Sequence, residues 1–155
     1  MKSAYNKALG YIARQDRTER QVRMYLTRAE YETEEIERAI DKLKDKKLLD
    51  DDKYARTVMA GKIKRKHYST VRARQYLYSE GVDEQLVGEI VEGLGADYEE
   101  EAAEHFILKE MKRTYSGKSR REKIEKIAQK AARHGYSYAA IMSVIDRLTE
   151  DEEEE

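Results

Sequence analysis

The sequence lacks the residues on which several classes of protein depend. It has no cysteine, which excludes disulfide bonds and thiolate metal sites. It has no proline and only 8 glycines among 155 residues, so helices can continue with few interruptions. No apolar run approaches the length of a membrane span, and no secretory segment follows Met1. These absences predict a helical protein of the cytoplasm that makes no contact with a membrane.

Signatures of catalysis and cofactor binding are absent as well. No serine lies in a G-x-S-x-G turn, and there is no G-x-x-x-x-G-K-[ST] loop for nucleotide phosphates. The three histidines, His67, His105 and His134, are widely separated in the sequence. Glu101 and His105 have the i, i+4 spacing of a metal-binding pair, but no second pair supports them, so an ordinary surface pair is preferred. We therefore expect no enzyme activity, no metal and no cofactor.

The composition is polar for a thick globule. Charged residues make up 41% and hydrophobic residues 39%, and tyrosine (12 residues) replaces nearly all other aromatic residues. The net charge of −1 conceals a segregation of charge. Residues 51–80 contain eight Lys or Arg against three Asp or Glu, residues 113–134 contain eight against two, and residues 81–112 contain two against ten. A thin, elongated layer of amphipathic helices fits this composition better than a thick core.

Residues 49–94 have the pattern of a three-helix unit. Asp50, Ser69 and Asp83 are placed as N-caps of its helices, and Gly81 as the left-handed residue that ends the second. An offset of 51 residues superposes the preceding chain on this unit without a gap, which indicates an internal repeat. The matched pairs include Ala4 and Ala55, Ala8 and Met59, Ile12 and Ile63, Thr18 and Ser69, Tyr25 and Tyr76, Leu26 and Leu77, Ile36 and Val87, Ile40 and Val91, and Leu43 and Leu94.

A third copy follows with an offset of 54 in its last part. There Gly135 corresponds to Gly81, and Ile141 corresponds to Val87. The first helix of this copy is expected over about 98–112, with a middle helix capped near Ser119. In the first copy, Thr33 is expected to cap the third helix.

The sequence thus predicts an all-α fold of three tandem three-helix repeats that form an elongated, curved array. The predicted repeats are residues 1–48, 49–95 and 96–149. The acidic run 150–155 is expected to be a frayed or disordered tail.

Two basic blocks are candidate sites for a polyanion, because clustered Lys and Arg release counterions when they bind phosphates. Tyr68 and Tyr115 lie among these residues and are placed to stack on bases. The alternative is that both blocks are solvated faces that pair with the acidic residues 81–112, and both interpretations remain open. The predicted contacts are Lys62, Lys64, Arg65, Lys66, Arg72 and Arg74 in the first block and Arg113, Lys118, Arg120, Arg121 and Lys123 in the second, which continues through Lys126, Lys130 and Arg133.

Three consecutive carboxylates, Asp50, Asp51 and Asp52, suggest either a magnesium site or a helix start. Because they stand directly before a predicted helix, capping and the positive end of the helix dipole explain them better.

Several motifs resemble those of the RecX regulatory proteins of bacteria. Leu49-Asp50-Asp51-x-x-Tyr54-Ala55 is similar to the family pattern L-D-D-x-x-F/Y-A, and a basic stretch follows it. Tyr76-Leu77-Tyr78-Ser79-Glu80-Gly81-Val82 resembles the helix that ends in K-G-I. Arg133-His134-Gly135-Tyr136-Ser137 stands where R-R-G-F/Y-S is usual, and Ala8-Leu9-x-x-Ile12-Ala13 is similar to the start of the family pattern. The resemblance covers about residues 4–149.

This resemblance implies a cytoplasmic protein that is not an enzyme and regulates the RecA recombinase. Such proteins are understood to bind the RecA–DNA filament along its helical groove and to inhibit strand exchange, ATP hydrolysis and repressor coproteolysis. Contact with single- or double-stranded DNA is then expected to be weak or to depend on RecA, and an elongated monomer is expected. Two features depart from the pattern: Tyr68 stands where the family has a glycine in the basic turn, and the acidic run 150–155 is additional.

Two other classes of function remain in competition. One is a stand-alone helical DNA-binding module, and the other is a helical scaffold for contacts between proteins.

Overall fold

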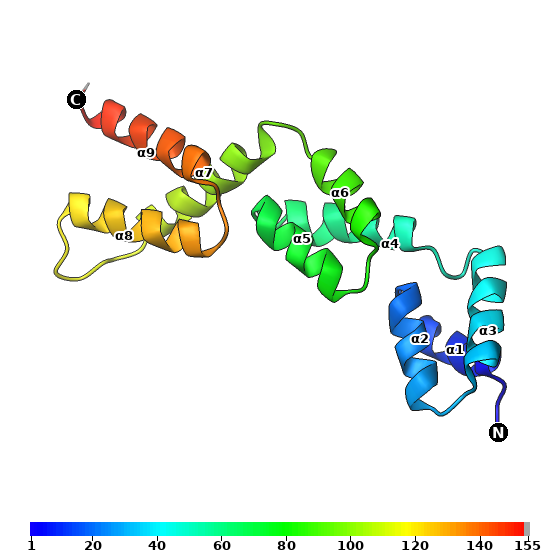
Figure 1. Cartoon of the computed structure of the whole chain (residues 1–155). Coiled ribbons are helices and arrows are strands. Elements are labelled where there is room, and N and C mark those ends of the chain that lie inside the picture. Colours follow the sequence, from blue (N-terminus) through cyan, green and yellow to red (C-terminus); the bar gives the residue numbers. More distant parts are fainter. Residues whose placement is uncertain (154–155) are drawn as a thin grey trace. The chain divides into compact units, whose positions relative to one another are not determined.

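The computed structural model describes residues 1–153, and within these residues it is entirely helical, as predicted (Figure 1). The elements are α1 (Ala4–Arg14), α2 (Glu19–Arg28), α3 (Thr33–Asp45), α4 (Asp51–Val58), the π-helix η1 (Met59–Lys64), α5 (Thr70–Ser79), α6 (Glu84–Glu92), α7 (Tyr98–Met111), α8 (Arg120–Arg133) and α9 (Tyr138–Glu153). Over the described residues, none of these helices is both long and apolar enough to cross a membrane.

The chain divides into two compact units, which are described separately. Unit 1 comprises Met1–Ala60 and Tyr76–Ile90, and unit 2 comprises Gly61–Gln75 and the chain from Val91 onward. The division therefore passes through the predicted central repeat rather than between repeats. The boundaries 1–48, 49–95 and 96–149 remain a prediction.

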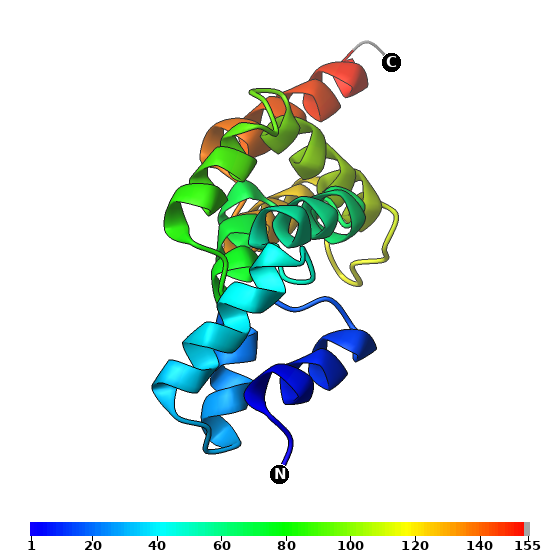
Figure 2. The same ribbon diagram turned by 90° about the vertical axis from the view of Figure 1, so that its right-hand side faces the viewer.

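In unit 1, α1, α2 and α3 pack against one another as a small bundle, coloured blue to cyan in Figure 2. Their apolar stripes meet in a core that includes Val22, Leu26 and Ile40, all fully buried. The expected cap at Thr33 is wrong by one residue, since α3 has Glu32 as its N-cap and begins at Thr33. The acidic first turn and basic last turn of α3 complement its dipole.

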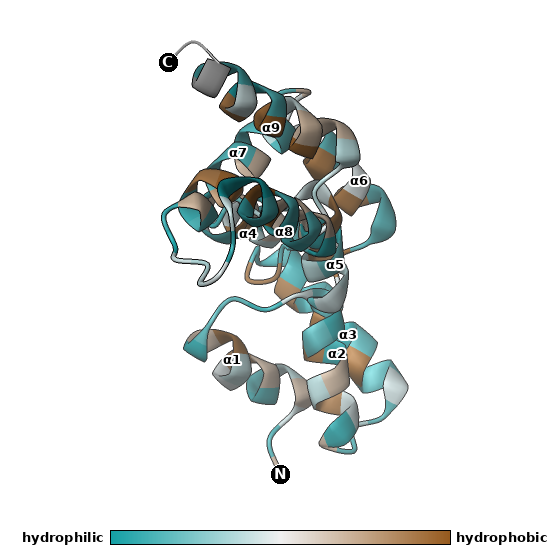
Figure 3. Cartoon of the chain, turned by 90° about the vertical axis from the view of Figure 1, so that its left-hand side faces the viewer, coloured by the Kyte–Doolittle hydropathy of each residue, from teal (hydrophilic) through white to brown (hydrophobic). Residues whose placement is uncertain are grey.

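In unit 2, α7 packs against both α8 and α9. The core of unit 2 includes Ile107, Ile127 and Val144. Most of α8 is teal, or hydrophilic, in Figure 3. The expected cap at Ser119 is confirmed, because its hydroxyl accepts the Glu122 N–H. The expectation of a frayed tail is wrong for residues 150–153, since α9 continues through them; residues 154–155 lie outside the described part.

The first helix of the central repeat differs from its counterpart α1. After eight α-helical residues, α4 continues into the π-helix η1, which ends before a left-handed residue, His67 (φ 55°). Asp50 caps this element by accepting the Lys53 N–H at 3.1 Å, so the interpretation of the three aspartates as a helix start is confirmed. Lys62 and Lys64 consequently lie on a helix rather than in a loop between helices.

Unit 1 contains a connection between sequence-distant helices that we call the first joint. Thr18, the N-cap of α2, donates its hydroxyl proton to the Glu80 carbonyl at 2.6 Å and is fully buried. Gly81, which follows Glu80, has φ +91°, and a Cβ there would lie 2.7 Å from the Cβ of Arg20. Only glycine allows this close approach without a shift of the neighbouring chain.

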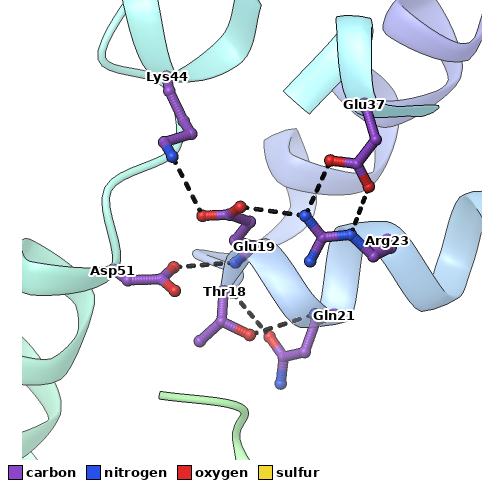
Figure 4. Close-up of polar contacts among 7 residues, drawn as sticks. All are labelled: Thr18, Glu19, Gln21, Arg23, Glu37, Lys44 and Asp51. Atoms are coloured by element: carbon purple, nitrogen blue, oxygen red, sulfur yellow. Dashed lines mark hydrogen bonds and ion pairs between the residues drawn. The ribbon is translucent and has the colours of Figure 1, made fainter. Parts of the chain in front are cut away.

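The N-terminus of α2 receives a further acceptor at this joint (Figure 4). Asp51, the first residue of α4, accepts the Glu19 N–H at 2.8 Å. Gln21 completes a capping box with Thr18, and its Nε2 donates to the Glu80 carboxylate at 2.7 Å. Two orphan amides of α2 are thus satisfied by Thr18 and Asp51.

Unit 2 contains the same connection, the second joint, between α5 and the α8–α9 loop. Ser69 caps α5 by accepting the Arg72 N–H, and its hydroxyl donates to the His134 carbonyl at 2.8 Å. Gly135 follows with φ +94°, and a Cβ there would lie 2.7 Å from the Ser69 hydroxyl and 3.2 Å from the Cβ of Val71. The offsets of 51 and 54 residues found in the sequence map each of these groups onto the first joint.

A carboxylate acts at the second joint as well. Glu99, in the first turn of α7, accepts the Thr70 N–H at 2.9 Å with one oxygen and the Ser137 N–H at 3.1 Å with the other. The Tyr136 hydroxyl donates to the His67 carbonyl, and burial raises the pKa of Tyr136 to about 12. The α8–α9 loop is therefore held against the turn that precedes α5.

Candidate nucleic-acid interface

All eleven predicted contact residues fall in unit 2, but they do not form one patch of equivalent groups. The first group lies on the last part of the π-helix η1, in the turn after it and on the start of α5. Lys64, Arg65 and Lys66 are exposed, and the Arg65 Nε donates to the Gly61 carbonyl at 2.8 Å. The positive φ of His67 turns the chain sharply after these cations. This geometry separates them from Arg72 and Arg74, which lie on α5.

The prediction that Tyr68 stacks on bases is wrong. Tyr68 is 8% exposed, and its ring lies beneath the Arg72 guanidinium at 4.2 Å. Its carbonyl accepts the Tyr98 hydroxyl at 2.7 Å. Tyr68 was expected to stand in the place of the family glycine, but the left-handed residue of this turn is the preceding residue, His67. Tyr68 is a core residue whose ring packs against the Arg72 guanidinium.

The second group surrounds the start of α8. Ion pairs join Lys118 to Glu122 at 3.9 Å and Arg121 to Glu125 at 3.5 Å, both on exposed side chains. Such pairs contribute little to stability and leave both cations accessible to a partner. Arg120 lies in the same first turn of α8.

Lys123 and Arg113 differ from the other predicted contacts because they are engaged inside the unit. The Lys123 ammonium donates to the Met111 carbonyl at 2.6 Å and lies 5.6 Å from the centre of the Tyr115 ring. Arg113 pairs with the buried carboxylate of Glu110 at 3.3 Å. These two residues stabilise the α7–α8 loop, which reduces their freedom to contact a ligand.

Glu110, in the last turn of α7, is a buried acid beside this loop. Lys130 pairs with it at 3.0 Å, and the Tyr115 hydroxyl donates to it at 2.9 Å. Burial alone raises the pKa of a carboxyl group, but these partners, together with Arg113, lower the pKa of Glu110 below its ordinary value. Tyr115, predicted to stack on bases, is thus half-buried and hydrogen-bonded to Glu110.

The histidines are closer in space than their sequence separation indicated. The His67 and His105 rings stack with centroids 3.6 Å apart, and His134 lies 4.8 Å from the Phe106 ring. Burial and the neighbouring His105 lower the pKa of His67. Within residues 1–153, no group of three or more His, Cys, Asp or Glu side chains is arranged to hold a metal ion.

Sequence reasoning missed that Arg72 of the first block meets the far end of the second block. Arg72 lines an open pocket together with Lys130, Arg133 and His134. The missed signal was the pair of matched repeats: because Ser69 corresponds to Thr18 and Gly135 to Gly81, the start of α5 and the end of α8 had to be neighbours if the joint was repeated.

Comparison with known proteins gives consistent matches. Residues 4–43 match the family model of the RecX first three-helix domain. The chain is 30% identical to regulatory protein RecX of Clostridioides difficile over 149 residues, covering 94% of this chain and 68% of the relative. It is 26% identical to that of Oceanobacillus iheyensis, covering 98% and 56%. It thus spans between roughly half and two thirds of the length of these relatives.

Solved structures agree with the sequence matches. The crystal structure of RecX from Lactobacillus salivarius has a TM-score of 0.78 and 28% identity, with 94% of both chains covered. Another crystal structure of regulatory protein RecX has a TM-score of 0.80 and 25% identity, covering 92% of this chain and 71% of that one. The fold, the repeat motifs and these matches agree, and the chain belongs to the RecX family of regulatory proteins.

Proposed function

We propose that this protein is a non-catalytic regulator that binds the RecA–DNA filament in the cytoplasm and lowers its ATPase, strand-exchange and coprotease activities. The observation that carries the proposal is the similarity over 94% of the chain to a protein named regulatory protein RecX. The absence of catalytic motifs in the sequence is in keeping with a role exerted through binding.

We further propose that the protein is a monomer and that its structural units are three three-helix repeats at 1–48, 49–95 and 96–149. The recurrence of one joint at two places supports this division. An array of repeats offers an extended binding surface rather than a pocket, which suits a partner that is itself a repeating filament.

A titration against RecA tests the proposal. Increasing amounts of the protein are added to RecA and single-stranded DNA, and ATP hydrolysis and strand exchange are followed. Both rates are expected to fall by the time the protein is in molar excess over RecA. Unchanged rates at a clear excess would contradict the proposal.

The predicted basic contacts are tested by charge reversal. The triple variant Lys64→Glu, Arg65→Glu, Arg72→Glu is expected to inhibit RecA at least about tenfold less strongly, because several charged contacts are lost together. Its matched control reverses three exposed arginines of unit 1: Arg14→Glu, Arg28→Glu, Arg38→Glu. Circular dichroism establishes that both variants remain helical, and an equal loss in both would show that the effect is not specific to the basic turn.

A second candidate function is DNA binding without RecA. The pocket that joins Arg72 to Lys130 and Arg133 favours it, since these cations come from separate helices. This function predicts steeply salt-dependent binding to DNA alone. The RecA titration with a DNA-only control separates the two candidates.

A further inference from the structure

The open pocket at the second joint has a volume of about 430 Å³, and we call it the joint pocket. It is lined by Val71, Arg72 and Gln75 of α5 and by Lys130, Arg133, His134 and Gly135 at the end of α8. No acidic side chain is among the residues that line it. Two carboxylates nearby are already engaged: Glu110 is buried and pairs with Lys130 at 3.0 Å, and Glu99 accepts the Thr70 and Ser137 N–H groups. Arg72 and Arg133 therefore give the pocket an excess of positive charge.

The first joint shows that the fold does not require these cations. The offsets of 51 and 54 residues place Gln21 where Arg72 stands, Tyr76 where Lys130 stands and Ser79 where Arg133 stands. Glu80 takes the place of His134 and accepts hydrogen bonds from Gln21 and Tyr54. The first joint has Arg20 in the place of Val71, but the positions of Arg72, Lys130 and Arg133 hold neutral residues there. Since joint geometry does not explain the basic groups, a ligand is the better explanation.

Arg72 and His134 of the joint pocket are held in place before any ligand arrives. The Arg72 guanidinium lies on the Tyr68 ring at 4.2 Å, and Tyr68 itself is buried. The His134 ring lies against Phe106, and its carbonyl accepts the Ser69 hydroxyl. Side chains that are already ordered lose less conformational entropy when they bind, which favours recognition of a small charged group.

The electrostatic surroundings of His134 point the same way. Burial lowers the pKa of His134, and the nearby charges of Arg72, Lys130 and Arg133 lower it further, while Glu110 acts in the opposite direction. An anion in the pocket would offset the effect of the three cations and raise this pKa toward the ordinary value. His134 is therefore an internal reporter of anion binding.

We propose that the joint pocket binds a phosphate group of a single-stranded nucleic acid. The proposal deepens the proposed function, because it assigns one nucleic-acid contact of the regulator to named residues. A phosphate is the anion that arginines on two helices bind with several charge-assisted hydrogen bonds. The exposed ring of Tyr138, 79% accessible at the start of α9, follows the pocket loop directly. Base stacking on such a ring favours a nucleic-acid strand over an acidic peptide.

The matching variant takes its residues from the first joint: Arg72→Gln together with Arg133→Ser. Both replacements already occur at equivalent places in this fold, at Gln21 and Ser79, so the joint is expected to form. Its control, Arg28→Gln with Arg38→Ser, removes the same charge from exposed positions of unit 1. Thermal unfolding followed by circular dichroism compares the stability of the two variants.

Binding of a fluorescent single-stranded oligonucleotide of mixed sequence, without RecA, is measured by anisotropy over a range of salt concentrations. Each lost phosphate contact reduces the slope of log K against log salt by about 0.7. Because R72Q/R133S removes the contact with one phosphate, it is expected to reduce the slope by about 0.7 and to weaken binding at low salt about tenfold or more. The control is expected to keep the slope of the unchanged protein. Equal slopes in all three proteins, or an equal loss in both variants, would overturn the proposal.

A second measurement needs no variant. The imidazole pKa of His134 is followed by NMR in the full chain with and without inorganic phosphate, and phosphate is expected to raise it. Absence of an effect at tens of millimolar phosphate would overturn the proposal, as would an acidic peptide that binds at the pocket while the oligonucleotide does not. Because RecA is absent from both measurements, their failure leaves the proposed regulation of RecA untouched. Failure of the RecA titration likewise leaves the joint pocket standing.

Discussion

The first and second joints use the same bonds but differ in the side chains that surround them. Each has a buried hydroxyl that caps a helix and donates to a carbonyl, a left-handed glycine directly after that carbonyl, and a carboxylate on the helix N-terminus. Around them, Gln21 and Glu80 at the first joint correspond to Arg72 and His134 at the second. The conserved geometry therefore depends on the hydroxyl, the glycine and the carboxylate, and the remaining positions are free to acquire a function.

The largest expected effect tests whether the close approach at each glycine matters. Gly81→Ala and Gly135→Ala should each lower the free energy of unfolding by about 2–4 kcal/mol, because a left-handed backbone is combined with overpacking. Gly95→Ala is the matched control, since Gly95 has φ +89° but nothing within 4 Å of an added Cβ. It should cost only about 1–2 kcal/mol.

Urea unfolding followed by circular dichroism measures all three glycine variants. Equal losses in the three would show that the joints do not depend on close packing at Gly81 and Gly135. A large loss at only one of them would show that the two joints are not equivalent.

The next effect concerns the two hydroxyls. Thr18→Ala and Ser69→Ala remove an N-cap and leave a buried carbonyl without its donor, so each should cost about 1–3 kcal/mol in unfolding free energy. Thr18→Ser and Ser69→Thr keep the hydroxyl and should retain most of the stability. If the alanine and hydroxyl variants unfold at the same urea concentration, the shared bond is not what stabilises the joints.

Substitution of the two joint carboxylates, Glu99 and Asp51, should have a smaller effect on the free energy of unfolding. Glu99 accepts two backbone amides, so Glu99→Gln should cost about 1–2 kcal/mol because one N–H then faces an amide group. Asp51 accepts one amide, and Asp51→Asn keeps an acceptor for it, so the cost should stay below about 0.5 kcal/mol. Unfolding free energies at pH 7 compare the two variants, and a larger loss in Asp51→Asn would contradict this ranking.

Asp51 also predicts a pH dependence of definite sign. Burial raises its pKa above the ordinary 3.8, against the opposing effect of the Glu19 amide. The folded state then holds this proton more tightly, so the contribution is present below pH 3.8 and is lost as the pH rises through the raised pKa. Asp51→Asn should flatten that part of the stability curve, measured by urea unfolding between pH 3.5 and 6.5. An unchanged curve would contradict the assignment.

Much of the fold could be predicted because its signals are local. Caps such as Ser69 and Ser119 and the left-handed Gly81 are read from neighbouring residues, and the offset of 51 residues extended them over a second copy. The all-α class and the family resemblance are confirmed by the helices and by the solved relatives. These properties depend on residues a few positions apart.

Other features could not be predicted because they depend on contacts across the chain. Apolar periodicity does not distinguish the π-helix η1, which carries Lys62 and Lys64, from a continued α-helix. Tyr68 lies within a basic stretch, yet it is buried, with the Arg72 guanidinium over its ring and its carbonyl bonded to the Tyr98 hydroxyl. The stacking of His67 on His105 requires the packing of α7 against the π-helix turn, which no local pattern reports.

One residue of the α2–α3 loop limits how a longer array could be built. Glu30 occupies the place that Gly81 holds in the next repeat, and it has φ 67° although it carries a side chain. A three-helix module grafted before α1 through the same joint would meet this Cβ where the natural joints have none. Modular extension at that side therefore requires Glu30→Gly, so a designer can read from one position which faces of a repeat are able to accept a neighbour.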